Sequence, residues 1–303
     1  MVKINNTEVG QVGFGLMGMS PLPFPPPPIP PLSNHPLRPN LARLPPSESQ
    51  SFSAMKTALT HNSTFWNGGE LYGTPSSNSL QLLTSYFTAH PSDASKVVLS
   101  IKGGCIPGTM AQPDGSAANI RRSIDECLRV LDGKKSLDLF EAARLDPNVP
   151  VEETVGAIVE YIREGKVGGL SLSEVNAATI RKTGQFRKFE DIPEDSMLRH
   201  MPRFQPDVFD DNIKLLHEVE KIAEKKNATP GQVALGWVIA HSGKNGLGEI
   251  IPIPGATTEE RVKENTAPAK LTDEDMKVIS DILKKFPVQG HRYPAALQGH
   301  LEQ

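Results

Sequence analysis

Two residues in the chain, Tyr72 and Lys102, could together carry out acid catalysis. Tyr72 follows the run FWNGGEL, and Lys102 ends the apolar run KVVLSIK. A free phenol has a pKa of about 10, so it donates a proton best when a nearby cation stabilises the phenolate that forms. Residue types alone favour an ordinary alternative, in which Tyr72 packs beside a glycine turn and Lys102 is a solvated lysine at a strand end.

Strand-like and helix-like segments alternate around these two residues. Apolar and β-branched runs predict strands over 12–19, 64–68, 96–102, 137–143, 167–172 and 249–254. Apolar residues at helical spacing predict helices over 53–61, 77–90, 116–130, 151–164, 176–182, 212–226, 230–241, 259–265 and 272–285. The alternation predicts a parallel sheet with helices outside it, as a barrel or as a doubly wound sheet. In a barrel, Lys102 would lie on the face where active sites occur.

The number of predicted strands falls short of a closed barrel. About six strands are expected, whereas a (β/α)₈ barrel has eight. The alternation stops after Thr183, and residues 184–207 are charged, proline-containing and loop-like. We therefore expect residues 1–303 to form a single α/β domain, an incomplete barrel of TIM type. Two absent strands would expose two long sheet edges, and the lost packing could exceed the net stability of a domain, about 5–15 kcal/mol.

Residues 21–50 contain a proline-rich stretch, PLPFPPPPIPPLSNHPLRPNLARLPP, which is unlike the rest of the chain. Proline fixes φ and lacks a backbone N–H, so this stretch can join neither a sheet nor the interior of a helix. We expect a disordered or polyproline II insertion on the surface. Its PxxP spacings could alternatively be ligands for SH3-type domains.

Composition disfavours several classes of protein. The 303 residues carry a net charge of -3, whereas nucleic acid and anionic membranes attract basic surfaces. No apolar run reaches the roughly 18 residues of a membrane span, and the polar N-terminus does not resemble a secretory signal. Two cysteines are too few for a disulfide framework, and the eight histidines show no metal-ligand spacing. We expect a cytoplasmic monomer that binds no metal.

Four blocks of the sequence, in this order, resemble the aldo-keto reductase family. They are GFGLMGMS at 13–20, NGGELYG at 67–73, LSIKGG at 99–104 and IPIPGATTEERVKEN at 251–265. Each block alone is weakly specific, but their order and spacing together are specific, and the resemblance covers most of 9–287 outside the proline-rich stretch. The runs FWNGGELYG and FEAARLDP are similar to the fungal pyridoxal reductases of that family. The resemblance implies NADPH-dependent reduction of a small aldehyde or ketone, with pyridoxal, reduced to pyridoxine, as the expected substrate.

The resemblance assigns catalytic roles to three residues. Tyr72 matches the family's catalytic Tyr and would donate the proton, while Lys102 matches the Lys that would stabilise the phenolate. The family's Asp falls on Asn67, a loss of charge that should make the Lys102 ammonium less stable, and the family's His falls on Ala143. Glu70 could compensate, although strand alternation does not fix its direction. The fungal subgroup shares both changes, so we interpret them as subgroup features.

The resemblance also places NADPH along the chain. Ser173 would hold the nicotinamide carboxamide, and it precedes Glu174, where the family often has Asn. Arg261 would bind the 2′-phosphate or the adenine face, because a guanidinium suits both; alternatively, it is an exposed Arg paired with a helical Glu. The other residues expected at the cofactor are Gly15, Leu16, Met17, Pro254, Gly255, Ala256, Thr257, Glu264 and Asn265.

A part of the family's pattern is absent after Thr183. In the family a strand, a helix and another strand follow here, and about fifty residues are missing from the eight-unit plan. This absence and the proline-rich insertion fit a splice variant or a gene-model error, a hypothesis that sequencing the transcript tests. The alternative to an enzyme is therefore a catalytically inactive remnant or interaction protein. A doubly wound dehydrogenase is disfavoured, because no GxGxxG turn follows the first strand.

Overall fold

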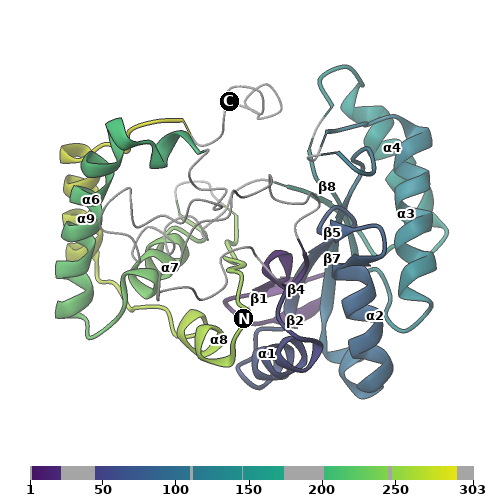
Figure 1. The fold of residues 1–303 in the computed structure, drawn as a ribbon, viewed down its shortest axis with the longest axis horizontal. Coiled ribbons are helices and arrows are strands. Elements are labelled where there is room, and N and C mark those ends of the chain that lie inside the picture. The colour runs from purple at the N-terminus through teal and green to yellow at the C-terminus, as the bar shows by residue number, and fades with distance from the viewer. Residues whose placement is uncertain are drawn as a thin grey trace, which may run out of the picture.

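The sheet at the centre of the molecule has five parallel strands (Figure 1). The computed structural model of the protein describes residues 2–21, 45–109, 112–144, 146–173, 201–244 and 248–291. In sheet order the strands are β3 (Phe14–Gly15), β4 (Phe65–Gly69), β7 (Val98–Gly103), β8 (Leu139–Ala142) and β9 (Leu170–Leu172). A helix lies between each consecutive pair of these strands, which is the arrangement of a TIM-type barrel.

The predicted strand 249–254 lies beside β3, but as an irregular extended segment. The Gly13 amide donates to the Pro252 carbonyl at 2.9 Å, and the Gly15 amide donates to the Pro254 carbonyl at 3.1 Å. Pro252 and Pro254 have no backbone N–H to donate in return, so a regular ladder cannot form there. The segment nevertheless takes the place of a sixth strand.

The sheet does not close into a complete barrel within the described residues. β9 is the last strand of the sheet, and no described strand pairs with its outer edge. The opposite edge, at β3, is covered by the extended segment 252–255. Five strands and one extended segment agree with the expected count of about six. The fold is therefore a TIM-type (β/α)₈ barrel that is open between β9 and this segment.

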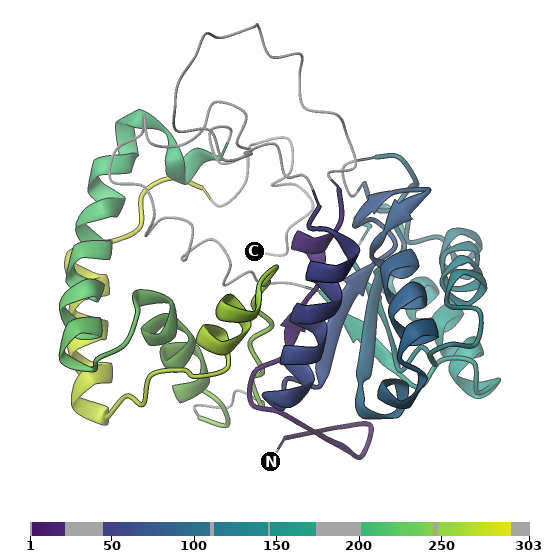
Figure 2. The same ribbon diagram turned by 60° about the horizontal axis from the view of Figure 1, so that its bottom comes forward.

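Four helices cover the outer side of the sheet, as Figures 1 and 2 show: α1 (Glu48–Thr60), α2 (Ser79–Ala89), α3 (Ala117–Leu131) and α4 (Val151–Arg163). Side chains fix the starts of the first three, because Ser47, Asn78 and Ser116 each accept a hydrogen bond from the first turn. The Ser47 cap explains why α1 begins at Glu48, inside the range 21–50 that was expected to be disordered.

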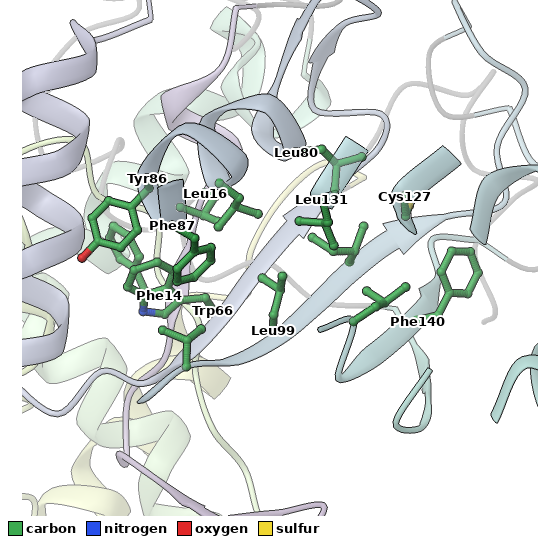
Figure 3. Packing of buried hydrophobic residues seen from close by; sticks show 14 of the residues in the cluster. Phe14, Leu16, Trp66, Leu80, Tyr86, Phe87, Leu99, Cys127, Leu131 and Phe140 are labelled. Atoms are coloured by element: carbon green, nitrogen blue, oxygen red, sulfur yellow. The ribbon is translucent and has the colours of Figure 1, made fainter. Parts of the chain in front are cut away.

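Apolar residues from the sheet and from helices α1–α4 form the main core (Figure 3). Phe14, Trp66, Leu99 and Phe140 come from four neighbouring strands and are at most 2% exposed. The Trp66 ring also stacks on Phe87 of α2, with centroids 5.9 Å apart. Strands covered on both faces are mostly apolar, which is why these runs could be recognised in the sequence.

The C-terminal helices share small cores of their own. α6 (Pro206–Lys225), α7 (Pro230–Ala240) and α9 (Asp273–Lys285) meet around Ile222, Val233 and Ile279. In Figures 1 and 2, α6 and α9 lie across the molecule from α3 and α4. Helix α8 (Glu259–Asn265) instead packs against α1. A barrel helix normally covers a strand, whereas these small cores contain no described strand residue.

Two short hairpins were not predicted from the sequence. β1 (Val2–Ile4) and β2 (Thr7–Val9) pair in antiparallel fashion before the barrel begins. Asn5 and Asn6 between them have φ values of 46° and 63°, which a tight hairpin turn requires and Asn tolerates. A second hairpin, β5 (Gly73–Thr74) and β6 (Ser77–Asn78), follows β4.

Three expectations fall on residues outside the described part of the chain. They are the helix 176–182, the proline-rich stretch from 22 to 44, and the cofactor residue Glu174. The other predicted helices are present. Helix α6 begins at Pro206 and not at 212, since proline is favoured in the first turn of a helix.

Candidate active site

Tyr72 and Lys102 lie at the same end of the sheet, where β4 and β7 finish. Gly69, the last residue of β4, pairs with Lys102 of β7. The Tyr72 amide donates to the Gly69 carbonyl at 3.1 Å, so the chain turns tightly between the strand and this side chain. The carboxyl ends of parallel strands form the active-site face of a barrel, and the structure brings both side chains to that face.

The Tyr72 ring lies directly over Gly69. A Cβ atom at Gly69 would lie 3.1 Å from two carbons of the ring, so a larger residue would push the ring away. The Lys102 Nζ atom is 5.9 Å from the centre of the same ring, within the range of cation–π attraction.

Lys102 is a buried lysine, 9% exposed. Burial lowers its pKa, because the ammonium loses contact with water, and the charge of Glu141 opposes this shift. The nearby Arg144 guanidinium adds to the lowering. The charged form of Lys102 is therefore favoured by a carboxylate partner.

Glu141 of β8 is that partner. It is 6% exposed and pairs in register with Lys102, and its Oε1 lies 3.1 Å from the Lys102 Nζ. Asn67 of β4 completes a triangle: the Lys102 Nζ donates to Asn67 Oδ1 at 2.5 Å, and the Asn67 Nδ2 donates to Glu141 Oε2 at 2.6 Å. The Ser100 hydroxyl donates to the same Oε2 at 3.0 Å. The buried carboxylate is thus paired and hydrogen-bonded, as burial requires.

Position 67 supplies no carboxylate, as expected, and the Lys102 pKa is lowered, but the expectation missed a carboxylate that lies beside Lys102. The carboxylate comes from the neighbouring strand, which the argument from position 67 did not consider. A signal was present in the sequence, since Glu is rarely buried without a partner and Glu141 stands among apolar residues of the predicted strand 137–143.

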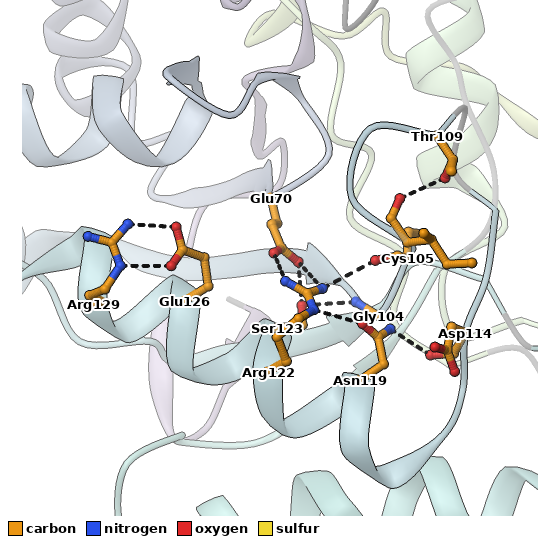
Figure 4. A network of polar contacts seen from close by, with 11 residues as sticks. Glu70, Gly104, Cys105, Thr109, Asp114, Asn119, Arg122, Ser123, Glu126 and Arg129 are labelled. Carbon is orange, nitrogen blue, oxygen red and sulfur yellow. Dashed lines mark hydrogen bonds and ion pairs between the residues drawn. The ribbon is translucent and has the colours of Figure 1, made fainter.

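Glu70, considered above as a substitute, faces helix α3 and not Lys102 (Figure 4). Its carboxylate accepts from Arg122 Nη1 at 2.6 Å and from the Ser123 hydroxyl at 2.5 Å. Arg122 also donates to the Cys105 carbonyl at 3.2 Å. These contacts tie the end of β4 and the segment after β7 to α3, so Glu70 stabilises the loops beside the site.

Residues expected near the nicotinamide lie on the same edge of the sheet. Gly15 pairs in parallel with Gly255, which joins the first and last sequence blocks. Leu16 is fully buried in the main core, so only its backbone could meet a cofactor. Met17 begins the short helix η1 (Met17–Met19) and is partly buried. Ser173 follows β9 and is also partly buried.

Residues expected near the adenosine end lie around helix α8. Pro254 and Ala256 are buried, while Thr257 is partly exposed and its carbonyl accepts from the Gln50 side chain of α1 at 2.9 Å. Arg261 pairs with Glu264 at 2.7 Å, so the alternative interpretation, an Arg paired with a helical Glu, describes its contact in this structure.

Asn265 is the residue of this group with an unsatisfied buried side-chain atom. It is 3% exposed, and its Oδ1 has no hydrogen-bond partner among the described residues. Its Nδ2 donates to the Gly255 carbonyl at 3.4 Å. A buried acceptor without a donor is costly, and the amino group of an adenine would satisfy it.

Other chemistries find little support in the described part of the chain. There, no group of three or more His, Cys, Asp and Glu side chains could hold a metal ion. Nor is any described helix long and apolar enough to cross a membrane. Cys105 and Cys127 are both buried, and burial raises the pKa of each thiol, to about 11 for Cys105, which disfavours a thiolate nucleophile.

Comparison with known proteins identifies relatives along the whole chain. The sequence profile of the aldo/keto reductase family matches residues 39–193 and 182–284. A Schizosaccharomyces pombe protein named probable pyridoxal reductase 2 is 31% identical, over 98% of this chain and 98% of its own. A second protein named as a pyridoxal reductase, from Saccharomyces cerevisiae, is 28% identical over 83% of this chain and 92% of its own. The solved glycerol dehydrogenase of Gluconobacter oxydans has a similar fold, with a TM-score of 0.71 at 18% identity over 94% of each chain.

The same comparisons agree with a barrel that lacks a segment. The alignment with the S. pombe protein spans 353 positions and the chain has 303 residues, so at least 50 positions of the relative have no counterpart here. The family profile matches in two pieces that meet at 182–193, where the strand–helix alternation stops. The chain therefore belongs to the aldo/keto reductase family, whose members are oxidoreductases of small carbonyl compounds that use a nicotinamide cofactor.

Proposed function

We propose that the protein reduces a small aldehyde, pyridoxal, to its alcohol with NADPH as the source of hydride. The observation that carries the proposal is the buried Lys102 ammonium 5.9 Å from the Tyr72 ring, at the carboxyl edge of the sheet. The choice of pyridoxal is supported by the names of the S. pombe and S. cerevisiae relatives.

Reduction of a carbonyl needs a hydride at carbon and a proton at oxygen. Bound NADPH supplies the hydride. The Tyr72 hydroxyl donates the proton to the carbonyl oxygen, and the Lys102 ammonium stabilises the phenolate that remains until solvent returns a proton. Ala143 carries only a methyl group where the family has His, so Tyr72 delivers the proton without an imidazole from the end of β8.

Asn67 acts on this pair through Lys102. Its Oδ1 accepts from the ammonium at 2.5 Å and holds the charge in place beside the phenol. A fixed cation needs no reorganisation when the phenolate forms, and such preorganised charge is a major source of catalytic stabilisation.

The cofactor would lie along the edge between β9 and α8. Ser173, with Glu174 after it, would hold the nicotinamide carboxamide, while Gly15 and Met17 would contact the cofactor near β3. The buried, unpartnered Oδ1 of Asn265 fits the amino group of adenine. Arg261 would bind the 2′-phosphate by exchanging or sharing its contact with Glu264.

Turnover of the purified chain with pyridoxal and NADPH tests the proposal. We expect NADPH absorbance to fall and pyridoxine to accumulate in equal amounts, as chromatography would show. If the chain reduces other small aldehydes but not pyridoxal, the proposal of a reductase stands and pyridoxal is rejected as its substrate. Heat-denatured protein serves as the control for non-enzymatic reaction.

A second candidate, a catalytically inactive remnant, is favoured by the outer edge of β9, which no described strand covers. Two measurements separate the candidates. The first is an NADPH titration monitored by quenching of Trp66 and Trp237 fluorescence, and the second is thermal unfolding measured by circular dichroism. Saturable quenching with a cooperative melt supports the enzyme. A cooperative melt without quenching supports the remnant.

A further inference from the structure

We propose that Glu141 is the positioning residue that keeps Lys102 charged, and that the Asn67 amide links the two. The inference rests on the proposed function, because it concerns the Lys that would stabilise the Tyr72 phenolate. It also goes beyond that function, since the carboxylate of the site would come from β8 and not from position 67.

The contacts form a closed ring of three polar groups. The Glu141 Oε1 lies 3.1 Å from the Lys102 Nζ, and the other carboxylate oxygen accepts from the Asn67 Nδ2 at 2.6 Å. The Asn67 Oδ1 in turn accepts from the same ammonium at 2.5 Å. All three side chains are at most 9% exposed, so little water competes for these bonds.

The ring explains why position 67 holds an amide. An amide offers an acceptor to the ammonium and a donor to the carboxylate, and only one orientation serves both. An Asp at position 67 would place a second carboxylate within 2.6 Å of Glu141, where two negative charges repel. Asn67 and Glu141 are therefore a matched pair, and neither is the best residue without the other.

The charged and titratable groups around Lys102 have opposing effects. Glu141 on β8 favours the ammonium, whereas burial and the Arg144 guanidinium at the end of β8 disfavour it. Tyr72 lies on the side of β4, and its phenol carries no charge before the proton moves. Without the Glu141 carboxylate, Lys102 would lose its opposite charge, and the Asn67 oxygen and the Tyr72 ring would be left to favour the ammonium against burial and Arg144.

The role of Glu141 is measured most directly by the titration of Lys102 itself. Lysine labelled with ¹³C at Cε gives one NMR signal per residue, and the signal missing in Lys102→Arg identifies Lys102. We expect Glu141→Gln to lower the Lys102 pKa by about 1–3 units, the usual effect of one opposite charge at this distance. The double variant Asn67→Asp/Glu141→Gln should return the pKa towards that of the wild type, because it restores one carboxylate.

The single variant Asn67→Asp gives the most specific outcome. Introduced into the wild-type chain, Asn67→Asp should lower the melting temperature. Introduced into Glu141→Gln, the same substitution should raise it. The matched control is Glu70→Gln, which removes a carboxylate near the site that pairs with Arg122 and not with Lys102. An equal pKa shift of Lys102 in the control would overturn the assignment to Glu141.

The turnover assay separates this inference from the proposed function. In an active chain, loss of rate on the alkaline side should begin at lower pH in Glu141→Gln, with NADPH affinity unchanged. A wild-type chain without turnover, whose Lys102 pKa still falls in Glu141→Gln, would reject the function and support the ring. Full activity with an unshifted Lys102 pKa in Glu141→Gln would reject the ring alone. If Glu141→Gln does not fold, the folded double variant decides by whether its Lys102 pKa matches the wild type.

Discussion

The Lys102 ammonium lies 5.9 Å from the centre of the Tyr72 ring, and both side chains occupy the carboxyl edge of adjacent parallel strands. The register of β4 and β7, in which Gly69 pairs with Lys102, brings the ends of the two strands together. The tight turn after Gly69 then returns the phenol over the strand end. Chemistry at this edge therefore depends on strand register as much as on residue type.

Tyr72→Phe should abolish reduction while NADPH still binds. The substitution removes the proton donor and keeps the ring over Gly69, so the surrounding fold should not change. General acid catalysis typically contributes a factor of about 10²–10⁴, and a loss of this size is expected in turnover. NADPH affinity from tryptophan quenching should match the wild type. Retention of more than a tenth of the rate would show that another group donates the proton.

Lys102→Met should destabilise the fold strongly, because it leaves the Glu141 carboxylate buried without its charge partner. Breaking a buried pair by removing one partner typically costs about 3–5 kcal/mol. The double variant Lys102→Met/Glu141→Gln should recover part of this loss, since no charge is then left unpaired. Urea unfolding of the two single variants and the double variant measures the coupling. Additive free energies would mean that the 3.1 Å contact does not act as a pair.

Arg261→Ala should weaken NADPH binding much more than NADH binding. The guanidinium is 34% exposed at its side chain and can turn from Glu264 to a 2′-phosphate, which NADH lacks. Loss of a charged hydrogen bond is worth about 1.5–3 kcal/mol, so the NADPH Kd should rise by roughly tenfold to a hundredfold. Lys263→Ala, on the same helix and exposed, is the matched control. Equal weakening of both cofactors would place Arg261 at the adenine face instead.

Much of the barrel could be predicted because its strands are buried on both faces and read as apolar runs. The same double burial hid Glu141, since a strand without alternation does not show which side chains point inward. Its direction follows from the register of β7 and β8, where it pairs with Lys102, and register is a tertiary property. The β1–β2 hairpin was missed because three-residue strands give too short a pattern, although the Asn5–Asn6 turn signal was present.

Gly69→Ala should lower turnover while cofactor affinity stays unchanged. The added methyl group would lie 3.1 Å from the Tyr72 ring, so the ring must shift by a few tenths of an ångström away from the position that the Lys102 charge favours. Misplacement of a reacting group by a fraction of an ångström lowers the rate, because the reacting atoms are no longer held at the distance and angle that proton transfer needs. Gly156→Ala is the control: it is exposed in α4 with nothing within 4 Å of its added methyl, and it should stabilise the chain by up to about 1 kcal/mol. A Gly69→Ala variant with wild-type turnover would show that the ring tolerates the shift.

Asp93→Asn should remove a stabilising contribution that depends on pH. Burial of Asp93 would raise its pKa, but hydrogen bonds from Lys56, Lys96 and Tyr86 outweigh it and lower the pKa from 3.8 to about 2. A carboxyl group whose pKa is lower in the folded state stabilises the fold at pH values above its pKa in the unfolded state. This stabilisation is lost as pH falls through the pKa of the folded state. The free energy of unfolding of the wild type should therefore exceed that of the variant by about 2 kcal/mol at pH 7. This difference should narrow between about pH 4 and pH 2.

Urea unfolding of both proteins across this pH range measures the difference. Asp132→Asn, whose side chain is 73% exposed at the end of α3, is the control for removal of one negative charge. A difference between wild type and Asp93→Asn that stays constant down to pH 2 would mean that protonation of the Asp93 carboxyl does not weaken its contacts with the two lysines. Hydrogen bonds to Asp93, such as the one that the Tyr86 hydroxyl donates to its Oδ2 at 2.9 Å, would then account for its stabilising effect.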